Sequence, residues 1–377
     1  MANVLTSLAA DIYAARDIVG RELVGIIPAC MINADGSKRA AKGDTVRAAY
    51  TRAVTVSTSY APAMAIPEGT DQTIDNKTMS LDTFANVQIP WTGEDMKHMD
   101  NGAGFEYAYS MQILQAMRAI VNKIESDLGV AVDLGAGMGY GTAATTPFAS
   151  NLNDLSNIRR LLVDRGCPDD GQISAVYNTA AGVNLRNLSN LYKVNEAGNE
   201  DLLRRGVLLD LYGMKIRESA QIASHTAGSG ASYLLNGAVA AGATSITVDT
   251  GSGTILAGDV VTIGNFKYVV ATALAANVFT INSGMREAVA DNTAITVAAT
   301  QTANVAFHRQ AVELAMRPIA LPMGGDLAVD RMTVQDNFSG LVFDIAVYKG
   351  YQKAMMEVSC LYGVKVWKPD FVVKHMG

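Results

Sequence analysis

The sequence is short of charge, cysteine and histidine for its length. Of its 377 residues only 18% are charged, whereas 49% are hydrophobic, and mean hydropathy is +0.15. Soluble domains usually carry about 25% charged residues, so we expect much of this surface to be covered by something else. The cysteines, Cys30, Cys167 and Cys360, are too widely spaced for a disulfide framework and fit a reducing compartment. The four histidines show no zinc-ligand spacing.

Long apolar runs, a targeting segment and an excess of positive charge are missing too. No window approaches the ~20 continuous apolar residues of a membrane helix, and the first residues show no basic region followed by a cleavage site. The net charge is −6 and the pI is near 5.3, which argues against a dedicated nucleic-acid binder. The apolar content excludes a disordered chain, so we expect roughly two or three folded domains.

No catalytic, cofactor-binding or metal-binding set of residues is evident. The sequence contains neither a Gly-x-Ser-x-Gly elbow nor a phosphate-binding loop. The acidic pairs Glu94-Asp95 and Asp169-Asp170 are typical of a helix cap and a turn. The basic pairs Arg159-Arg160 and Arg204-Arg205 are not interleaved with aromatic residues. We therefore predict that the protein is not an enzyme and needs no cofactor.

One glycine-rich string, from Gly129 to Gly141, is an exception that needs weighing. Gly135, Gly137 and Gly139 are spaced as in the first motif of Rossmann-type methyltransferases. That motif requires a strand before the glycines and a helix after them, but here a long helical segment precedes them and Pro147 follows. The string predicts a flexible loop leaving a helix, with a methyltransferase site using S-adenosylmethionine as the alternative.

Helical periodicity is expected in five segments. The first has its apolar stripe at Leu5, Leu8, Ile12, Val19 and Leu23. The strongest runs from Phe105 to Leu128, long enough at ~1.5 Å per residue to cross a whole domain. The other three are 151–165, 180–191 and 305–316, and a buried strand is expected between the first two of these, at 173–177.

Period-two alternation predicts strands in the remaining parts of the chain. The first such part, 44–91, is a long excursion whose return half carries Val87, Ile89 and Trp91. It fits two strands of an ordinary sheet or an arm laid across a partner subunit equally well, since an isolated hairpin is marginal in water. From about 244 to 297, short β-rich runs separated by turns predict a small all-β unit, and the last part of the chain alternates again.

The order of these parts resembles that of the major capsid (coat) proteins of tailed bacteriophages. Three strings are similar to stretches of that family: DLSNIRRLLVDRGCPDDGQISAVYN, RRGVLLDLYGMKIRESAQI with Ser219, and NVAFHRQAVELAMRP with Phe307 and His308. The closing CLYGVKVWKPD also fits. The β-rich unit is similar in place to the inserted domain of podovirus-type coat proteins.

This resemblance implies an α+β fold of the Hong Kong 97-like type with an inserted small all-β domain. Its parts would be an N-terminal arm (1–43), an extended β loop (44–95), a spine helix with part of the peripheral domain (96–150), the first part of the axial domain (151–227), the inserted domain (228–300) and a return to the axial and peripheral domains (301–377).

The resemblance also implies a function and partners. The chain would assemble with itself, as hexamers and pentamers, into the icosahedral shell of a virion, in the host cytoplasm and with scaffolding and portal proteins. The shell would enclose double-stranded DNA without sequence-specific binding and without a membrane. An encapsulin-like compartment shell is the alternative with the same fold. Some relatives cross-link subunits through a loop lysine; Lys77 is the only lysine at the predicted loop tip, but the sequence identifies no partner for it.

Overall fold

The computed structural model describes residues 22–51, 56, 62, 64–66, 74–100, 105–188, 191, 210–335 and 340–377. The N-terminal helix predicted at 5–23 lies outside this range except for its last two residues, and so do Arg204-Arg205 and most of the RRGVLLDL string. None of the described helices is long and apolar enough to span a membrane.

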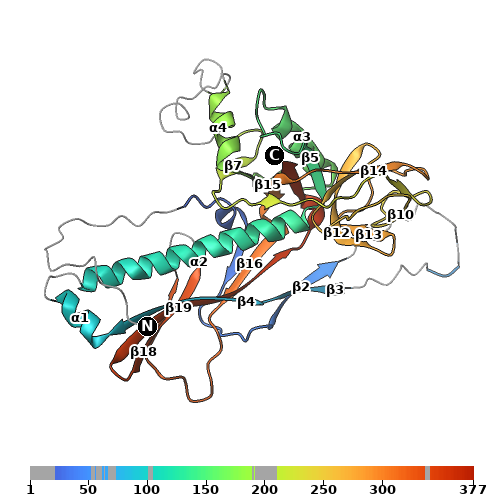
Figure 1. The fold of residues 1–377 in the computed structure, drawn as a ribbon. Helices are drawn as coiled ribbons and strands as arrows, with labels where there is room; N and C mark the ends of the chain where they lie inside the picture. Colours follow the sequence, from blue (N-terminus) through green and yellow to red (C-terminus); the bar gives the residue numbers. More distant parts are fainter. Residues whose placement is uncertain are drawn as a thin grey trace.

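A long helix and a mixed sheet form the centre of the molecule. Helix α2 (Phe105–Gly135) lies along a six-stranded sheet, with the short helix α1 (Gly93–Asp100) at one end (Figure 1). The sheet contains β1 (Met31–Ala34), β4 (Thr83–Thr92), β16 (Val312–Arg317), β17 (Ala328–Gln335), β18 (Val342–Gly350) and β19 (Lys353–Val366). The apolar stripe of α2, including Ile120, Ile124 and Leu128, packs with Met356 and Val358 of β19 in one core. The helical spacing of Ile120, Ile124 and Leu128 in the sequence predicted this helix.

A second sheet carries the remaining helices and a closed barrel. Its non-barrel strands are β5 (Met138–Gly141), β6 (Ile173–Tyr177), β7 (Lys215–Glu218), β8 (Ser224–His225), β15 (Gln301–His308) and β20 (Val372–Met376). Helices α3 (Asn153–Asp164) and α4 (Thr179–Asn187) lie near these strands. Both segments are helical, as their periodicity predicted. Short 3-10 turns η1 (Ile27–Ala29), η2 (Arg309–Ala311) and η3 (Pro369–Phe371) complete the described elements.

The β-rich stretch forms the barrel. Its strands are β9 (Tyr233–Leu235), β10 (Ser245–Asp249), β11 (Val260–Ile263), β12 (Phe266–Ala275), β13 (Val278–Ile281) and β14 (Ala294–Val297). They pair in the order β11-β14-β9-β10-β13-β12, and the pairing of β11 with β12 closes the ring. The interior holds its own apolar cluster, including Ile246, Tyr268 and Phe279. Antiparallel pairing of β12 with β5 joins the barrel to the rest of the sheet.

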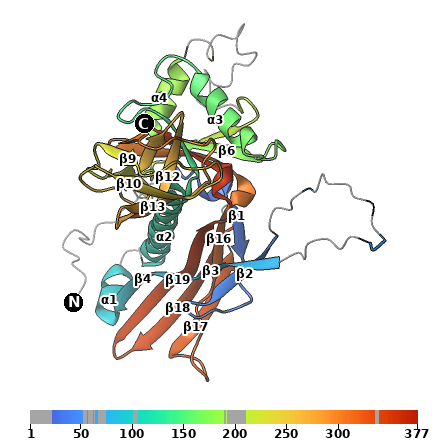
Figure 2. The ribbon, with the colours of Figure 1, turned by 90° about the vertical axis from the view of Figure 1, so that its right-hand side faces the viewer.

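The 44–91 excursion divides into two structures. Strands β2 (Thr45–Thr51) and β3 (Ile74–Ser80) form a separate two-stranded hairpin that projects sideways from the body (Figure 2). The return half, β4, pairs with β19 along ten residues inside the main sheet. Ile89 and Trp91 are therefore buried in the subunit's own core. The interpretation as strands of an ordinary sheet is confirmed for β4, and an arm laid across a partner subunit stays a prediction for the hairpin.

The helix predicted at 305–316 is wrong. These residues form β15, the turn η2 and β16. Both strands are buried on both faces, so apolar residues form the continuous runs 305–307 and 314–316 instead of alternating with polar ones. A continuous apolar run of this kind does not distinguish a strand from a buried helix.

Candidate functional site

The glycines of the 129–141 string allow close packing. A Cβ on Gly135, the last residue of α2, would lie 2.6 Å from Cγ2 of Val366. On Gly137 it would lie 2.5 Å from the carbonyl oxygen of Pro369, a distance that real Cβ atoms do not reach. The prediction of a loop here is wrong, because the helix continues to Gly135 and β5 begins at Met138. Since packing explains the glycines, the methyltransferase hypothesis loses the motif on which it was based.

A pocket of about 520 Å³ lies beside β5 and contains a buried histidine. The ring centroid of His375 lies 5.6 to 5.8 Å from those of Tyr140, Phe148 and Tyr177. Burial lowers the pKa of His375 to about 4, so the imidazole is neutral at neutral pH. Its Nε2 lies 3.8 Å from Oδ2 of Asp154. No cluster of three or more His, Cys, Asp or Glu side chains that could bind a metal occurs in the described part of the chain.

Four charged side chains meet in the interior where α2, the barrel and β20 join. Nδ1 of His225 lies 3.0 Å from Oδ2 of Asp133, and its Nε2 lies 2.9 Å from Oδ1 of Asp259. Nζ of Lys374 forms an ion pair with Asp133 and donates a 3.0 Å hydrogen bond to the carbonyl oxygen of Gly258. Hydrogen bonds to Asp133 and then Asp259 raise the pKa of His225 to about 9, so its imidazole is charged at neutral pH. We call these four side chains the junction cluster.

The junction cluster was not predicted from the sequence. Its members come from four separate segments, and no spacing rule connects them. The one available signal is a charged residue inside an apolar run, as for Asp133 in GVAVDLG and Lys374 in FVVKHM.

The start of the described chain is fixed to α2 by carboxylates. Glu125 is buried and its carboxylate accepts hydrogen bonds from the backbone N–H groups of Gly25, Ile26 and Ile27, at 2.7 to 2.9 Å. One and two turns earlier on the helix, Asn122 donates to Glu22 at 2.7 Å and Arg118 forms an ion pair with it. Residues 22–27 therefore follow the helix axis.

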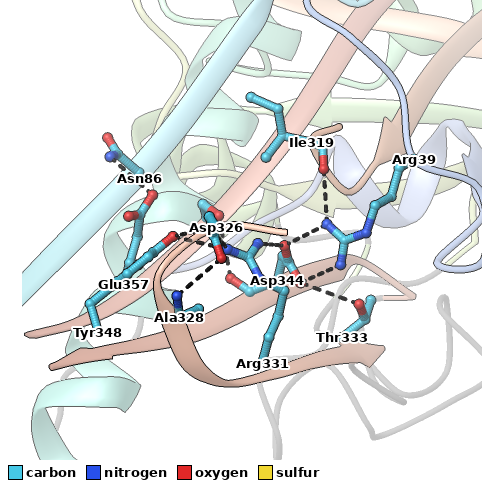
Figure 3. A network of polar contacts seen from close by, with 11 residues as sticks. Arg39, Asn86, Ile319, Asp326, Ala328, Arg331, Thr333, Asp344, Tyr348 and Glu357 are labelled. Carbon is cyan, nitrogen blue, oxygen red and sulfur yellow. Dashed lines mark hydrogen bonds and ion pairs between the residues drawn. The ribbon is translucent and has the colours of Figure 1, made fainter. Parts of the chain in front are cut away.

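A second polar network fixes the segment leading to the hairpin against the outer strands of the main sheet (Figure 3). Asp344 of β18, nearly fully buried, accepts from Arg39 at 3.0 Å and from Arg331 of β17 at 2.7 Å. Arg331 also pairs with Asp326, which accepts a 2.8 Å hydrogen bond from the hydroxyl of Tyr348. The bond from Tyr348 lowers the pKa of Asp326. The base of the hairpin is thus rigidly connected to the subunit.

The most exposed large apolar side chains of the described residues lie on segments that connect strands. Met64 and Ile66, between β2 and β3, are almost fully exposed, and so are Met323 and Leu327 before β17. Single exposed apolar residues are normal, but groups of them mark sites of interaction with another molecule. The covered surface expected from the low charge content stays a prediction, and these segments are candidates for it.

The sequence suggested that Lys77 lies at a loop tip, but the structure places it elsewhere. It lies in β3, opposite Ala48 of β2, and its Nζ donates a 2.8 Å hydrogen bond to the carbonyl oxygen of Trp367. Partial burial, followed by the positive charges of Lys368 and Lys365, lowers its pKa. This hydrogen bond connects Lys77 to the residue that follows β19 in the same subunit.

Comparison with solved structures shows which known proteins share this fold. Neither a protein-family model nor a curated protein sequence matches the chain. Among solved structures, the capsid of cyanophage P-SCSP1u matches with a TM-score of 0.55 and 11% identity, covering 99% of this chain and 93% of that one. A chain of Mycobacterium phage Che8 matches with a TM-score of 0.53 and 13% identity over 97% and 94%. The mature capsid of bacteriophage PhiM1 matches with a TM-score of 0.50 and 13% identity over 97% and 91%. The chain has the fold of phage capsid subunits along nearly its whole length.

Proposed function

We propose that this chain is the major capsid protein of a tailed bacteriophage and builds the icosahedral shell that encloses its double-stranded DNA. The observation that carries the proposal is the likeness to phage capsid chains over 97% to 99% of the length. A likeness of that extent is not restricted to one part of the chain.

The fold is of the Hong Kong 97-like type in this proposal. The N-terminal arm is 1–43, the extended loop begins at 44, and α2 is the spine helix. The axial domain is built from 151–227 and part of 301–377, and the barrel is a domain inserted at 228–300. Its closed ring of strands and separate apolar cluster support the insertion.

Two physical features support a shell role. A two-stranded hairpin is marginally stable by itself, and its exposed apolar residues, such as Met64 and Ile66, find cover on a neighbouring copy. The net charge of −6 also suits a container that must not hold its DNA, because each neutralised phosphate would add salt-dependent affinity. Hexamers and pentamers of the chain, with scaffolding and portal proteins as partners, would form the shell in the host cytoplasm and persist in the virion.

Assembly of the purified chain tests the proposal. We expect light scattering after size-exclusion chromatography and electron microscopy to detect closed particles, alone or with the scaffolding protein from the same gene neighbourhood. Met64→Asp should prevent assembly and Met64→Leu should not. A wild-type chain that stays monomeric under every condition, scaffolding protein included, would overturn the proposal. A neighbouring portal or terminase gene separates a phage subunit from an encapsulin-like compartment.

A further inference from the structure

The barrel is attached to the body by strand pairing, by Val260 and Val269, which pack in the main core, and by the side chain of Asn282, which donates hydrogen bonds to the carbonyl oxygens of Leu134 and Ala136. Strand β12 pairs with β5 at two positions, and the chain enters the barrel after β8, which pairs with the first two residues of β15, where the chain leaves it. The junction cluster lies between these attachments, with Asp133 on α2, His225 on β8, Lys374 on β20 and Asp259 just before β11.

Asp259 connects the loops at this side of the barrel. Its carboxylate, fully buried, accepts hydrogen bonds from the backbone N–H groups of Gly228, in the entering segment, and of Leu256, in the loop before β11. Gly258, with φ of +87°, brings that loop close to the body: a Cβ there would lie 2.6 Å from Cδ2 of Leu134 and 2.7 Å from Cε1 of His225. The imidazole of His225 is therefore the direct bridge between Asp259 on the barrel side and Asp133 on the helix.

The charges in this cluster balance only while His225 is protonated. Asp133 and Asp259 supply two negative charges, and Lys374 and the imidazolium supply two positive ones. The side chains of all four are at most 10% exposed. If the imidazole loses its proton, one buried carboxylate is left without a compensating charge, and an unpaired buried charge is strongly unfavourable.

We propose that protonated His225 is a latch that fastens the barrel to α2 and β20, and that removing its charge lets the barrel detach while the main sheet stays folded. The latch is a property of the single chain, so it does not depend on the shell function.

The direction of the pH dependence follows from the contacts of His225. Asp133 and Asp259 face its two ring nitrogens, and the positive charge of Lys374 acts against its protonation. Because the pKa is raised from 6.5 to about 9, the stabilisation of the closed joint is complete below pH 6.5 and is lost as pH rises through 9. We take a pKa of 6.5 for His225 in the open joint and about 9 in the closed joint. Protonation then raises the equilibrium constant for closing, relative to a neutral imidazole, by about 30-fold at pH 7.5 and by about twofold at pH 9.

Hydrogen exchange of the unassembled full-length chain tests the latch. His225→Gln keeps hydrogen-bonding groups at this position but removes the charge, and His98→Gln, at an exposed position on α1, is the matched control. At pH 7.5 we expect exchange in the barrel peptide that pairs with β5, 266–270, to be about 30-fold faster in His225→Gln than in wild type, with β19 peptides unchanged. At pH 9 the ratio should fall to about twofold, whereas the control should match wild type throughout.

A ratio that does not depend on pH would mean that His225 acts by packing alone, and would overturn the proposal. Equal acceleration in the barrel and in β19, or none in either, would overturn it as well. Should His225→Gln fail to fold, the wild-type protein decides: between pH 6.5 and 9.5, barrel peptides must lose protection relative to β19 peptides after correction for intrinsic exchange. Since no step requires assembly, the outcome is separate from that of the shell experiment.

Discussion

Replacing Trp91 distinguishes a strand of the subunit core from a strand of a projecting arm. Its indole is 4% exposed and packs in the main core, and its Nε1 donates a 3.0 Å hydrogen bond to Oε1 of Gln112 on α2. Truncating a buried aromatic residue costs about 3–5 kcal/mol, and the lost hydrogen bond adds about 1 kcal/mol. We expect Trp91→Ala to destabilise the subunit by about 4–6 kcal/mol, a large part of the ~5–15 kcal/mol that holds a domain folded.

Urea unfolding followed by circular dichroism measures this effect. Trp91→Phe retains most of the buried ring and should lose about 1–2 kcal/mol. Met64→Asp changes a fully exposed side chain beyond β2, and its free energy of unfolding should stay within ~0.5 kcal/mol of wild type. If Trp91→Ala unfolds at the wild-type urea concentration, β4 is not part of the subunit core and the division of the 44–91 excursion is incorrect.

Three further perturbations follow from single contacts. Hydrogen bonds from Arg118 and Asn122 lower the pKa of Glu22 to about 2, so its stabilising effect is complete above pH 4.5 and lost as pH falls through 2; thermal melting of Glu22→Gln should depend less on pH in that window. Gly137→Val must displace Pro369 and should lower stability by about 1–3 kcal/mol in the same urea assay. Burial raises the pKa of the cysteine thiols to about 12 for Cys30 and Cys360 and about 11 for Cys167, so a chromogenic disulfide reagent at pH 8 should react with them only after denaturant is added.

The parts of the fold that the sequence predicted are those with one buried face. Helix α3 appears where the pattern placed it, because the period of its apolar residues is unambiguous. Strand β6 is an exception, since it was predicted as a buried strand and is buried at every position. The pair Glu94-Asp95 begins α1, where the backbone N–H of Asp95 donates to Thr92 Oγ1 and Thr92 N–H donates to Asp95. Where both faces are buried, as in β15 and β16, the period disappears and the helix prediction failed.

The residues of the junction cluster, which hold α2, the barrel and β20 together, could not be predicted from the sequence for a different reason. His225 and Lys374 are 149 positions apart, and their proximity depends on β20 lying beside β5 and on α2 ending next to the barrel. Local patterns carry no information on such pairings. For the same reason, the glycines of the 129–141 string suggested a ligand when their neighbours are Val366, Pro369 and Val260 from distant segments.

The hairpin shows how a stable subunit can carry an element that is incomplete by itself. At its base, Met79 and Leu81 pack with Leu361 and Trp367 in a small cluster, and Asp344 holds the preceding segment through Arg39. Beyond that base, Met64 and Ile66 contribute exposed apolar surface and no described core contact. An anchored base fixes the direction in which the hairpin projects, so little orientational entropy remains to be lost when a neighbouring copy covers it. In the proposed shell, weak contacts at the far end would then suffice for binding between copies.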